Sequence, residues 1–264
     1  MGQQVVQLTR RKFGETMRRD TWWVPQVGAF VILSSFLAYA TWAAFQNAHF
    51  EYGPYLSPFY SPLIFGQSPH AWFAERPWFI PLWVSPALVI LPFPAGFRFT
   101  CYYYRGTYYK AFWADPPGCA VGEPRNSYLG ERHLPLILQN VHRYFLYAAL
   151  LFLIILGLDA VRGYFFADAN GVKHFGIGVG SLVLTINVCL LSGYTLGCHS
   201  LRHLVGGYLD RLSGRPTRRK AYDCVSRLNR GHMNWAWASL IWVAFSDIYV
   251  RLCSMGIWHD IRIL

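Results

Sequence analysis

Apolar runs of membrane-spanning length, separated by polar and basic segments, are the dominant pattern of this chain. A run of about 20 apolar residues is what an α-helix needs to cross the hydrocarbon core of a bilayer. The predicted spans are, in order, about 22–45, 79–100, 134–159, 175–205 and 233–255. The pattern therefore predicts an all-α polytopic membrane protein, with five transmembrane helices bundled in a single domain of residues 1–264.

Prolines modify the second predicted span, which contains Pro86, Pro92 and Pro94. A proline inside a helix removes one hydrogen bond and clashes with the preceding turn. Neighbouring helices can satisfy the freed carbonyl groups when the helix lies in a bundle. We therefore expect a kinked second helix.

Charge is sparse and unevenly placed: the chain is 54% hydrophobic and 14% charged, with a formal net charge of +11. The Lys and Arg residues lie in the connections between the apolar runs, which is typical of membrane topology, so we expect membrane lipid and no nucleic acid as a partner. Positive-inside counting places the N-terminus, segment 98–133 and segment 205–231 in the cytoplasm. Five spans then leave the C-terminus outside, in a multi-pass protein of the inner (plasma) membrane.

Histidines gather near the predicted cytoplasmic ends of the spans. His199 and His203 are four residues apart, so they share one face of a helix, whereas Cys198 points to a different side. His142 and His232 approach the same level from the third and fifth spans. One such histidine alone is more often structural, but the group has the composition to hold one haem, a zinc ion or the histidine half of an iron–sulfur site.

Two cysteines add thiols to the candidate metal ligands. Cys101 ends the second span, and Cys119 lies in a Pro-Pro-Gly-Cys loop on the same, reducing side. Two thiolates on one iron and two imidazoles on the other is the ligation of a Rieske-type [2Fe–2S] cluster. Soluble Rieske domains carry paired Cys-x-His and Cys-x-x-His segments, which this chain lacks. Spacing alone therefore leaves the cofactor open, and we expect Cys189 and Cys253 only to pack as small apolar side chains.

Tyrosine and arginine are dense at the same end, where most of them anchor helices at the membrane interface. A quinone occupies an apolar cleft with few polar groups, and its carbonyl oxygens need hydrogen-bond donors. The candidates for binding a quinone are Tyr103, Tyr194 and Arg202.

Several segments together resemble a known family. They are Phe97-Arg-Phe-Thr-Cys101-Tyr-Tyr-Tyr-Arg105, Pro116-Pro-Gly-Cys119-Ala-Val, Leu138-Gln-Asn-Val-His142-Arg-Tyr144, Cys198-His-Ser-Leu-Arg-His203-Leu-Val-Gly-Gly207 and Asn229-Arg-Gly-His232-Met. This pattern resembles the membrane anchor (SdhC-like) subunit of the actinobacterial-type, or type F, succinate dehydrogenase of respiratory complex II. The similarity covers nearly the whole chain.

The resemblance implies a single membrane subunit that carries a flavoprotein subunit and an iron–sulfur subunit on its cytoplasmic face. It implies no haem, a membrane-embedded Rieske-type [2Fe–2S] cluster, and a site for quinone, either menaquinone or ubiquinone. Electrons from succinate oxidation would reach the quinone from the iron–sulfur subunit through that cluster. The matching ligand positions are Cys101, Cys119, His142 and one or two of His199, His203 and His232.

Two other functions are compatible with the pattern. A single-haem b-type cytochrome anchor would use His142 with His203 or His232, and would leave the cysteines as packing residues. A cofactor-free membrane scaffold or transporter would have structural histidines only, with acidic residues inside its spans. Asp159 and Asp247 lie near the predicted outer ends, which gives the transporter little support.

Overall fold

The computed structural model describes the chain except for residues 1–11, 126–132, 135 and 210. The described residues form two compact units. One unit comprises the residues up to Ser35 together with Thr100–Asn140, and the other comprises Phe36–Phe99 together with Val141–Leu264. The single domain of residues 1–264 stays a prediction.

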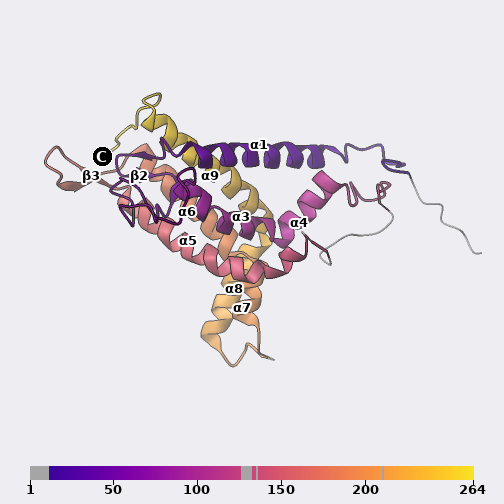
Figure 1. Ribbon diagram of the computed structural model, residues 1–264. Coiled ribbons are helices and arrows are strands. Elements are labelled where there is room, and N and C mark those ends of the chain that lie inside the picture. The colour runs from indigo at the N-terminus through magenta and orange to yellow at the C-terminus, as the bar shows by residue number, and fades with distance from the viewer. Residues whose placement is uncertain (1–11, 126–132, 135, 210) are drawn as a thin grey trace, which may run out of the picture. The chain divides into compact units, whose positions relative to one another are not determined.

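Four helices in the described part of the chain are long and apolar enough to cross a membrane. They are α1 (Val24–Gln46), α5 (His142–Arg162), which follows the 3₁₀ turn η4 (Leu136–Val141), α6 (Val179–Leu196) and α9 (His232–Ser254) (Figure 1). These helices and the small amount of sheet agree with the predicted all-α membrane class. The count of five spans and the sidedness of the termini stay predictions.

The second predicted span is not one continuous helix. Its first residues, 79–85, are not helical, and the remainder divides into α2 (Pro86–Ile90) and α3 (Pro92–Phe99). The Ser85 hydroxyl caps α2 by accepting a hydrogen bond from the backbone N–H of Leu88 at 3.3 Å. Proline suits the first turn of a helix, because backbone N–H groups there have no hydrogen-bond partner within the helix, and it disrupts any later turn. The predicted kink is present, whereas a helix over 79–100 is not.

The fourth predicted span, 175–205, also divides. Helix α6 ends at Leu196, and α7 (His199–Gly206) begins after Cys198, whose backbone is extended (φ −65°, ψ 137°). The basic segment that follows contains α8 (Pro216–Arg230), which packs alongside α7 (Figure 1). One extended residue therefore turns the predicted single helix into two, and α7 and α8 form a helical hairpin.

The first unit contains short helical elements. Helix α4 (Tyr102–Tyr108) leads directly into a π-helical turn, η2 (Tyr109–Trp113). The loop that follows is tied to the first half of α1, because Gln26 Nε2 donates a hydrogen bond to the carbonyl oxygen of Pro117 at 2.8 Å. This unit carries Cys101 and Cys119.

Two small antiparallel hairpins belong to the second unit. Strand β1 (Glu51–Tyr52) pairs with β2 (Tyr55–Leu56), and the 3₁₀ turn η1 (Pro58–Tyr60) follows. Strand β3 (Phe165–Ala167) pairs with β4 (Lys173–Phe175) between α5 and α6. Aromatic side chains of the segment after α1, among them Phe59 and Tyr60, are buried against Ala43 and Ala44 of α1.

The tip of the β3–β4 hairpin is exposed and holds its own shape. One carboxylate oxygen of Asp168 accepts hydrogen bonds from the backbone N–H groups of Asn170 and Val172, each at 2.9 Å. Gly171 has a φ of +80°, a conformation that glycine adopts without strain. These local bonds keep the turn closed without help from other elements.

Three hydroxyl groups of the segment after α1 donate hydrogen bonds to three carboxylates, in the pairs Tyr55–Asp260, Ser57–Asp247 and Ser61–Asp159. The carboxylates come from the C-terminal tail, from α9 and from α5 respectively. Asp247 is fully buried and also accepts from Arg251 Nε at 3.2 Å and from the Tyr39 hydroxyl. The segment after α1 is thereby fixed to three separate parts of the second unit.

Replacing Asp247 by alanine is expected to destabilise the folded protein by about 3–5 kcal/mol, because it leaves the buried Arg251 guanidinium without its carboxylate. The rate of heat inactivation of the purified complex measures this loss. Asp168→Ala, which changes an exposed carboxylate, serves as the control. Equal inactivation rates for the two variants would contradict the importance of the buried pair.

Candidate functional site

Three candidate ligands of the second unit lie where helices begin. His142 is the first residue of α5, His232 is the first residue of α9, and Cys198 precedes the first residue of α7. Because α6 runs toward Cys198 while α5 and α9 run away from His142 and His232, these starts meet at one end of the helices. In the first unit, Cys101 likewise precedes the first residue of its helix, α4.

The most direct contact at this end joins an imidazole and a thiol. His142 Nε2 lies 3.1 Å from Cys198 Sγ, and Cys198 is 1% exposed. The sequence predicts that Cys198 points to a different side from the face shared by His199 and His203, and it does not predict which helix the thiol meets. In the structure Cys198 stands at the break between α6 and α7 and its thiol contacts α5, so Cys198 becomes a further candidate ligand.

A row of four rings runs from His142 to His232, with Phe97 and Tyr194 between the two imidazoles. The His142 imidazole stacks on Phe97 at a centroid distance of 4.8 Å, and Phe97 meets Tyr194 edge-on at 5.4 Å. Tyr194 stacks in turn on the His232 imidazole at 5.0 Å. The rings come from α3, α5, α6 and α9, so packing of all four helices holds the two imidazoles.

A close helix contact supports this arrangement. A Cβ atom added to Gly193 would lie 2.6 Å from the indole of Trp235, which is too close for any real side chain. Glycine therefore permits α6 to approach α9 at the level where Tyr194 meets His232. A larger residue at position 193 would push these two rings apart.

The other two histidines form an exposed pair. His199 Nε2 and His203 Nε2 are 3.0 Å apart on α7, which confirms that they share a helix face. Partial burial lowers the pKa of the His199 imidazole below its ordinary value, and nearby His203 and Arg202 act in the same direction. The pair is thus open to solvent, whereas His142, His232 and Cys198 are at least partly enclosed.

The two cysteines predicted as ligands both lie in the first unit and differ in burial. Cys101 is 2% exposed, whereas Cys119 is exposed. The Cys119 backbone is fixed by Arg18, whose Nη1 donates to its carbonyl oxygen at 3.1 Å. Their placement as ligands stays a prediction.

The residues predicted to bind quinone are dispersed. Arg202 contacts α8, where Nε donates to Ser226 Oγ at 3.0 Å and the guanidinium lies over the Tyr222 ring at 5.0 Å. Tyr103 belongs to the first unit, beside Tyr104. Tyr194 is buried and lines a cavity of the second unit.

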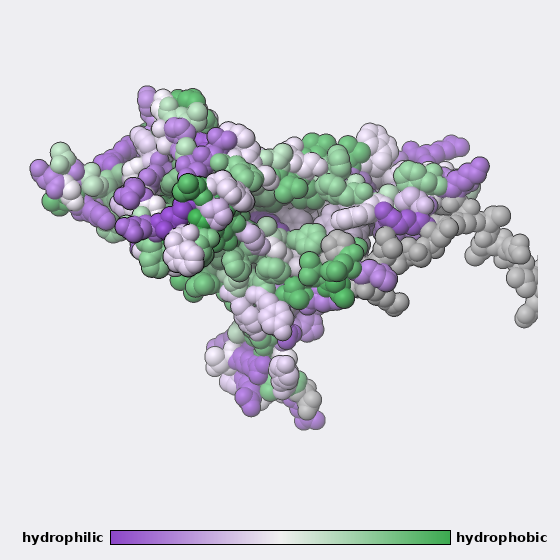
Figure 2. All heavy atoms as spheres, in the orientation of Figure 1, coloured by the Kyte–Doolittle hydropathy of each residue, from purple (hydrophilic) through white to green (hydrophobic). Residues whose placement is uncertain are grey.

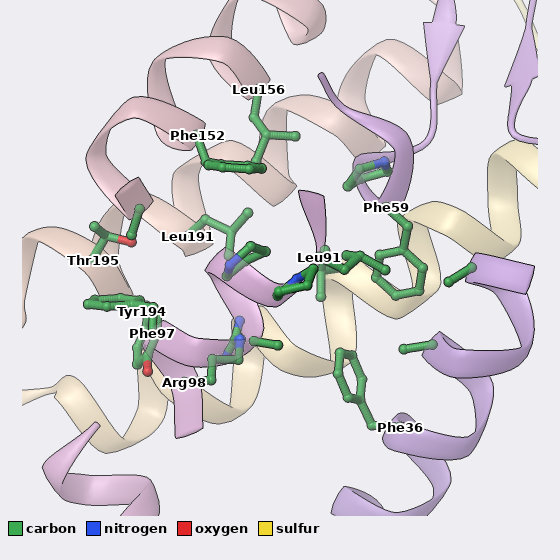
Figure 3. Close-up of a pocket in the computed structure, with 18 of the residues that line it drawn as sticks. Phe36, Phe59, Leu91, Phe97, Arg98, Phe152, Leu156, Leu191, Tyr194 and Thr195 are labelled. Carbon is green, nitrogen blue, oxygen red and sulfur yellow. The ribbon is translucent and has the colours of Figure 1, made fainter. Parts of the chain in front are cut away.

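This cavity has a volume of about 340 Å³ and mostly apolar walls (Figure 3). Phe97, Arg98, Tyr194 and Thr195 lie on one side of the view, and Phe36 and Phe59 lie on the other. Arg98 was not predicted as a functional residue, because a base at the end of a span is typical of topology. Its place in the cavity depends on how α3 packs against α6 and α9.

The α7–α8 hairpin is strongly basic, and hydrophilic side chains gather over it (Figure 2). The exposed bases on α8 and the connection before it are Arg211, Arg215, Arg219, Lys220, Arg227 and Arg230. Arg218 differs from them, because its guanidinium donates to the carbonyl oxygens of Val205 and Gly207 at 2.5 and 2.6 Å. Arg218 therefore holds the hairpin together, and the other bases face solvent.

These features define a class of protein: a polytopic helical membrane protein whose second unit has a thiol and imidazoles at one end of its helices and an apolar cavity beside them. Within the described residues, no three His, Cys, Asp or Glu side chains converge on a point that would hold a metal ion. A family model for the actinobacterial succinate dehydrogenase subunit SdhC matches residues 24–256, and the chain belongs to this family. It is therefore a subunit of succinate dehydrogenase, a multi-pass protein of the bacterial plasma membrane.

A solved structure gives the same result. The chain is 40% identical to a chain of the Mycobacterium smegmatis Sdh1 complex in the apo form, with 97% of each chain covered and a TM-score of 0.84. No curated protein matches the chain.

Proposed function

We propose that this subunit anchors the soluble subunits of a succinate:quinone oxidoreductase to the membrane and passes their electrons to quinone by way of a Rieske-type [2Fe–2S] cluster. The observation that carries the proposal is the 3.1 Å contact between His142 Nε2 and Cys198 Sγ. A thiol and an imidazole are the two kinds of ligand that this cluster uses. The donor chemistry of the site therefore fits the cluster.

Burial selects among the candidate ligands. We infer that, in the second unit, Cys198 supplies a thiolate and His142 and His232 supply the imidazoles, while Cys101 or Cys119 of the first unit stays the predicted source of the other thiolate. Cys198 is almost completely buried, and His142 and His232 are partly buried. His199 and His203 are exposed, and their ring nitrogens lie against each other.

When bound, such a cluster supplies a carrier for single electrons. The protein's own residues fix and enclose its ligands. Phe97 and Tyr194 cover one face of the His142 and His232 rings, so they limit their rotation and keep water away. Arg98, whose guanidinium lies 4.6 Å above the Tyr194 ring, adds a positive charge next to them.

The soluble partners are the flavoprotein and iron–sulfur subunits of succinate dehydrogenase. Their electrons have to enter at the end of the helices that carries His142 and Cys198, and the basic α7–α8 hairpin belongs to that end. Its exposed bases suit an acidic protein surface, and opposite charge speeds association and orients the partners. We infer that this hairpin contacts the iron–sulfur subunit.

Charge reversal of the hairpin is expected to weaken docking. Replacing Arg215, Arg219, Lys220 and Arg227 by glutamate, at about 0.5–1 kcal/mol per exposed charge, reduces affinity for the soluble subunits roughly 30-fold or more. The amount of flavoprotein that co-purifies with the anchor measures the effect, and added salt is expected to reduce the difference from the unaltered protein. Glutamine at the same four positions removes the positive charges without adding negative ones. Comparison of the glutamine and glutamate variants therefore separates lost attraction from added repulsion. Unchanged co-purification in the glutamate variant would exclude the hairpin as a docking surface.

Spectroscopy of the purified complex tests the proposed function. After reduction by dithionite, electron paramagnetic resonance is expected to show a rhombic signal with the low average g value of a Rieske centre. A Soret band without that signal would show that the subunit holds a haem in place of the cluster. The absence of both signals from an active complex would show that the subunit is a cofactor-free scaffold, and the proposal would be wrong.

A further inference from the structure

We propose that residues 72–84, which precede α2, form an aromatic loop that inserts into the interfacial layer of the phospholipid bilayer. In this layer the lipid headgroups meet the acyl chains. The loop belongs to the second unit, at the end of that unit away from His142 and Cys198. It needs neither the cluster nor the electron acceptor for this role, which follows from the membrane location of the subunit and from the surface of the loop.

Bulky apolar side chains dominate the surface of the aromatic loop. The exposed ones are Trp72, Phe73, Trp78, Phe79, Leu82 and Trp83. Trp78 is 94% exposed and Leu82 is 88% exposed. Soluble monomeric proteins rarely expose large continuous apolar surfaces, and such surfaces mark contacts with a membrane or with another protein. These side chains therefore require a partner outside the chain.

The single base of the aromatic loop is turned inward. Arg76 Nη1 donates hydrogen bonds to the carbonyl oxygens of Pro81 at 2.5 Å and of Val84 at 3.0 Å. The Arg76 guanidinium also lies over the Phe65 ring, 5.0 Å from its centroid. The loop thus binds its own positive charge, and the exposed rings are left to face less polar surroundings.

Backbone groups of the aromatic loop also find partners within the protein. Pro77 and Pro81 have no N–H group. The N–H groups of Ile80 and Val84 donate to the carbonyl oxygens of these two prolines, each at 3.0 Å. Backbone that enters lipid needs such internal partners, because hydrocarbon supplies none. This pairing suits a loop that lies partly below the lipid headgroups.

The aromatic loop is fixed at the level where two membrane-spanning helices end. The Ser85 hydroxyl, directly after the loop, donates to the carbonyl oxygen of Ala44 in the last turn of α1. Arg251, in the last turn of α9, donates to the carbonyl oxygen of Ala48, just beyond α1, at 2.8 Å. Spans leave the bilayer at their ends, and tryptophan is enriched at that level in membrane proteins.

The exposed rings continue a surface that lipid covers. Trp42 and Phe45, near the end of α1, are exposed at the same level, on a helix with the length and hydropathy of a membrane span. Tryptophan joins an apolar ring to an N–H donor, which suits a layer with acyl chains on one side and ester oxygens on the other. A second copy of the chain is a poorer match, because protein interfaces have a polar rim. The structure describes the whole loop, and its one exposed charged side chain is Glu75.

Photocrosslinking from the aromatic loop tests the proposal. p-Benzoyl-phenylalanine replaces Trp83, and the complete complex is irradiated in vesicles of phosphatidylethanolamine and phosphatidylglycerol. Benzophenone reacts with C–H bonds and not with water, so the anchor subunit is expected to gain the mass of a phospholipid, which mass spectrometry detects. The same replacement of Ile154, exposed on α5, is the positive control. Replacement of Asn170, at the exposed tip of the β3–β4 hairpin, is the negative control.

Three crosslinking results would overturn the proposal. The first is a lipid adduct from position 154 with none from position 83. The second is a crosslink from position 83 to a second copy of the chain or to another subunit in place of lipid. The third is equal lipid labelling from positions 83 and 170, which would show that the loop has no preference for the bilayer.

Tryptophan fluorescence supplies a second measurement that needs no crosslinking residue. The emission that is lost in Trp78→Phe combined with Trp83→Phe, relative to the unaltered complex, belongs to the two exposed indoles. We expect this difference emission to be quenched by lipids brominated near the headgroup end of the acyl chains and to be little affected by iodide in the water. Quenching by iodide without quenching by brominated lipid would place both rings in water and overturn the proposal.

Discussion

Replacing Cys198 by alanine is expected to lower quinone reduction by the assembled complex at least about 100-fold, because even outer-shell partners of metal ligands change affinity 10- to 100-fold. The thiol contacts His142 and is buried, so no water molecule or neighbouring side chain takes its place as a thiolate. Succinate oxidation by an artificial dye should continue, because the dye accepts electrons before the membrane step. Parallel assays with dye and quinone on the same preparation measure the difference.

Two other cysteines provide matched controls for Cys198. Cys253 is buried on α9 far from the start of that helix, and Cys189 is exposed on α6. Alanine at either position should leave both assays and the cluster signal nearly unchanged. A Cys198→Ala complex that keeps its signal and its quinone turnover would contradict the assignment of this thiol.

A second large loss of quinone reduction is expected when the two partly buried imidazoles, those of His142 and His232, are removed. His142→Ala combined with His232→Ala should abolish the cluster signal and quinone reduction, because alanine supplies no nitrogen ligand. If these residues only packed helices, the double variant would lose a few kcal/mol of stability and keep its turnover per assembled complex. Turnover normalised to assembled flavoprotein therefore separates ligation from packing.

The exposed histidine pair is the matched control for the enclosed pair. His199→Ala combined with His203→Ala removes two imidazoles from α7 and should retain the signal. The opposite pattern, with loss in this variant and retention in His142→Ala/His232→Ala, would show that the exposed pair holds the iron.

Much of the fold follows from local pattern, and the second span shows where local pattern is insufficient. The apolar runs predict α1, α5, α6 and α9, because hydropathy over about 20 residues requires no tertiary information. The prolines predict a kink after residue 86. How long the helix is on each side of the kink depends on which of the freed carbonyl groups neighbouring helices satisfy. The sequence therefore predicts a kinked helix where the structure has two short ones.

Part of the candidate site likewise follows from local sequence, and part of it depends on tertiary packing. The shared face of His199 and His203 is a consequence of helix periodicity, so spacing predicts it. The contact of Cys198 with His142 depends on a helix break that no proline marks, at the point where the apolar run ends, and on how α5 lies beside that break. The position of Arg98 in the cavity depends on packing between α3, α6 and α9, and the spacing of residues along the sequence does not predict that packing.

The self-contained tip of the β3–β4 hairpin has a practical use. Exposed turns that close through their own hydrogen bonds are the places where inserted sequence is best tolerated. Helix α5 has 21 residues and separates this tip from His142 by about 30 Å, at 1.5 Å per residue. An affinity handle inserted beside Gly171 would immobilise the complex through this tip and leave the opposite end of α5, where His142 lies, accessible to dissolved proteins.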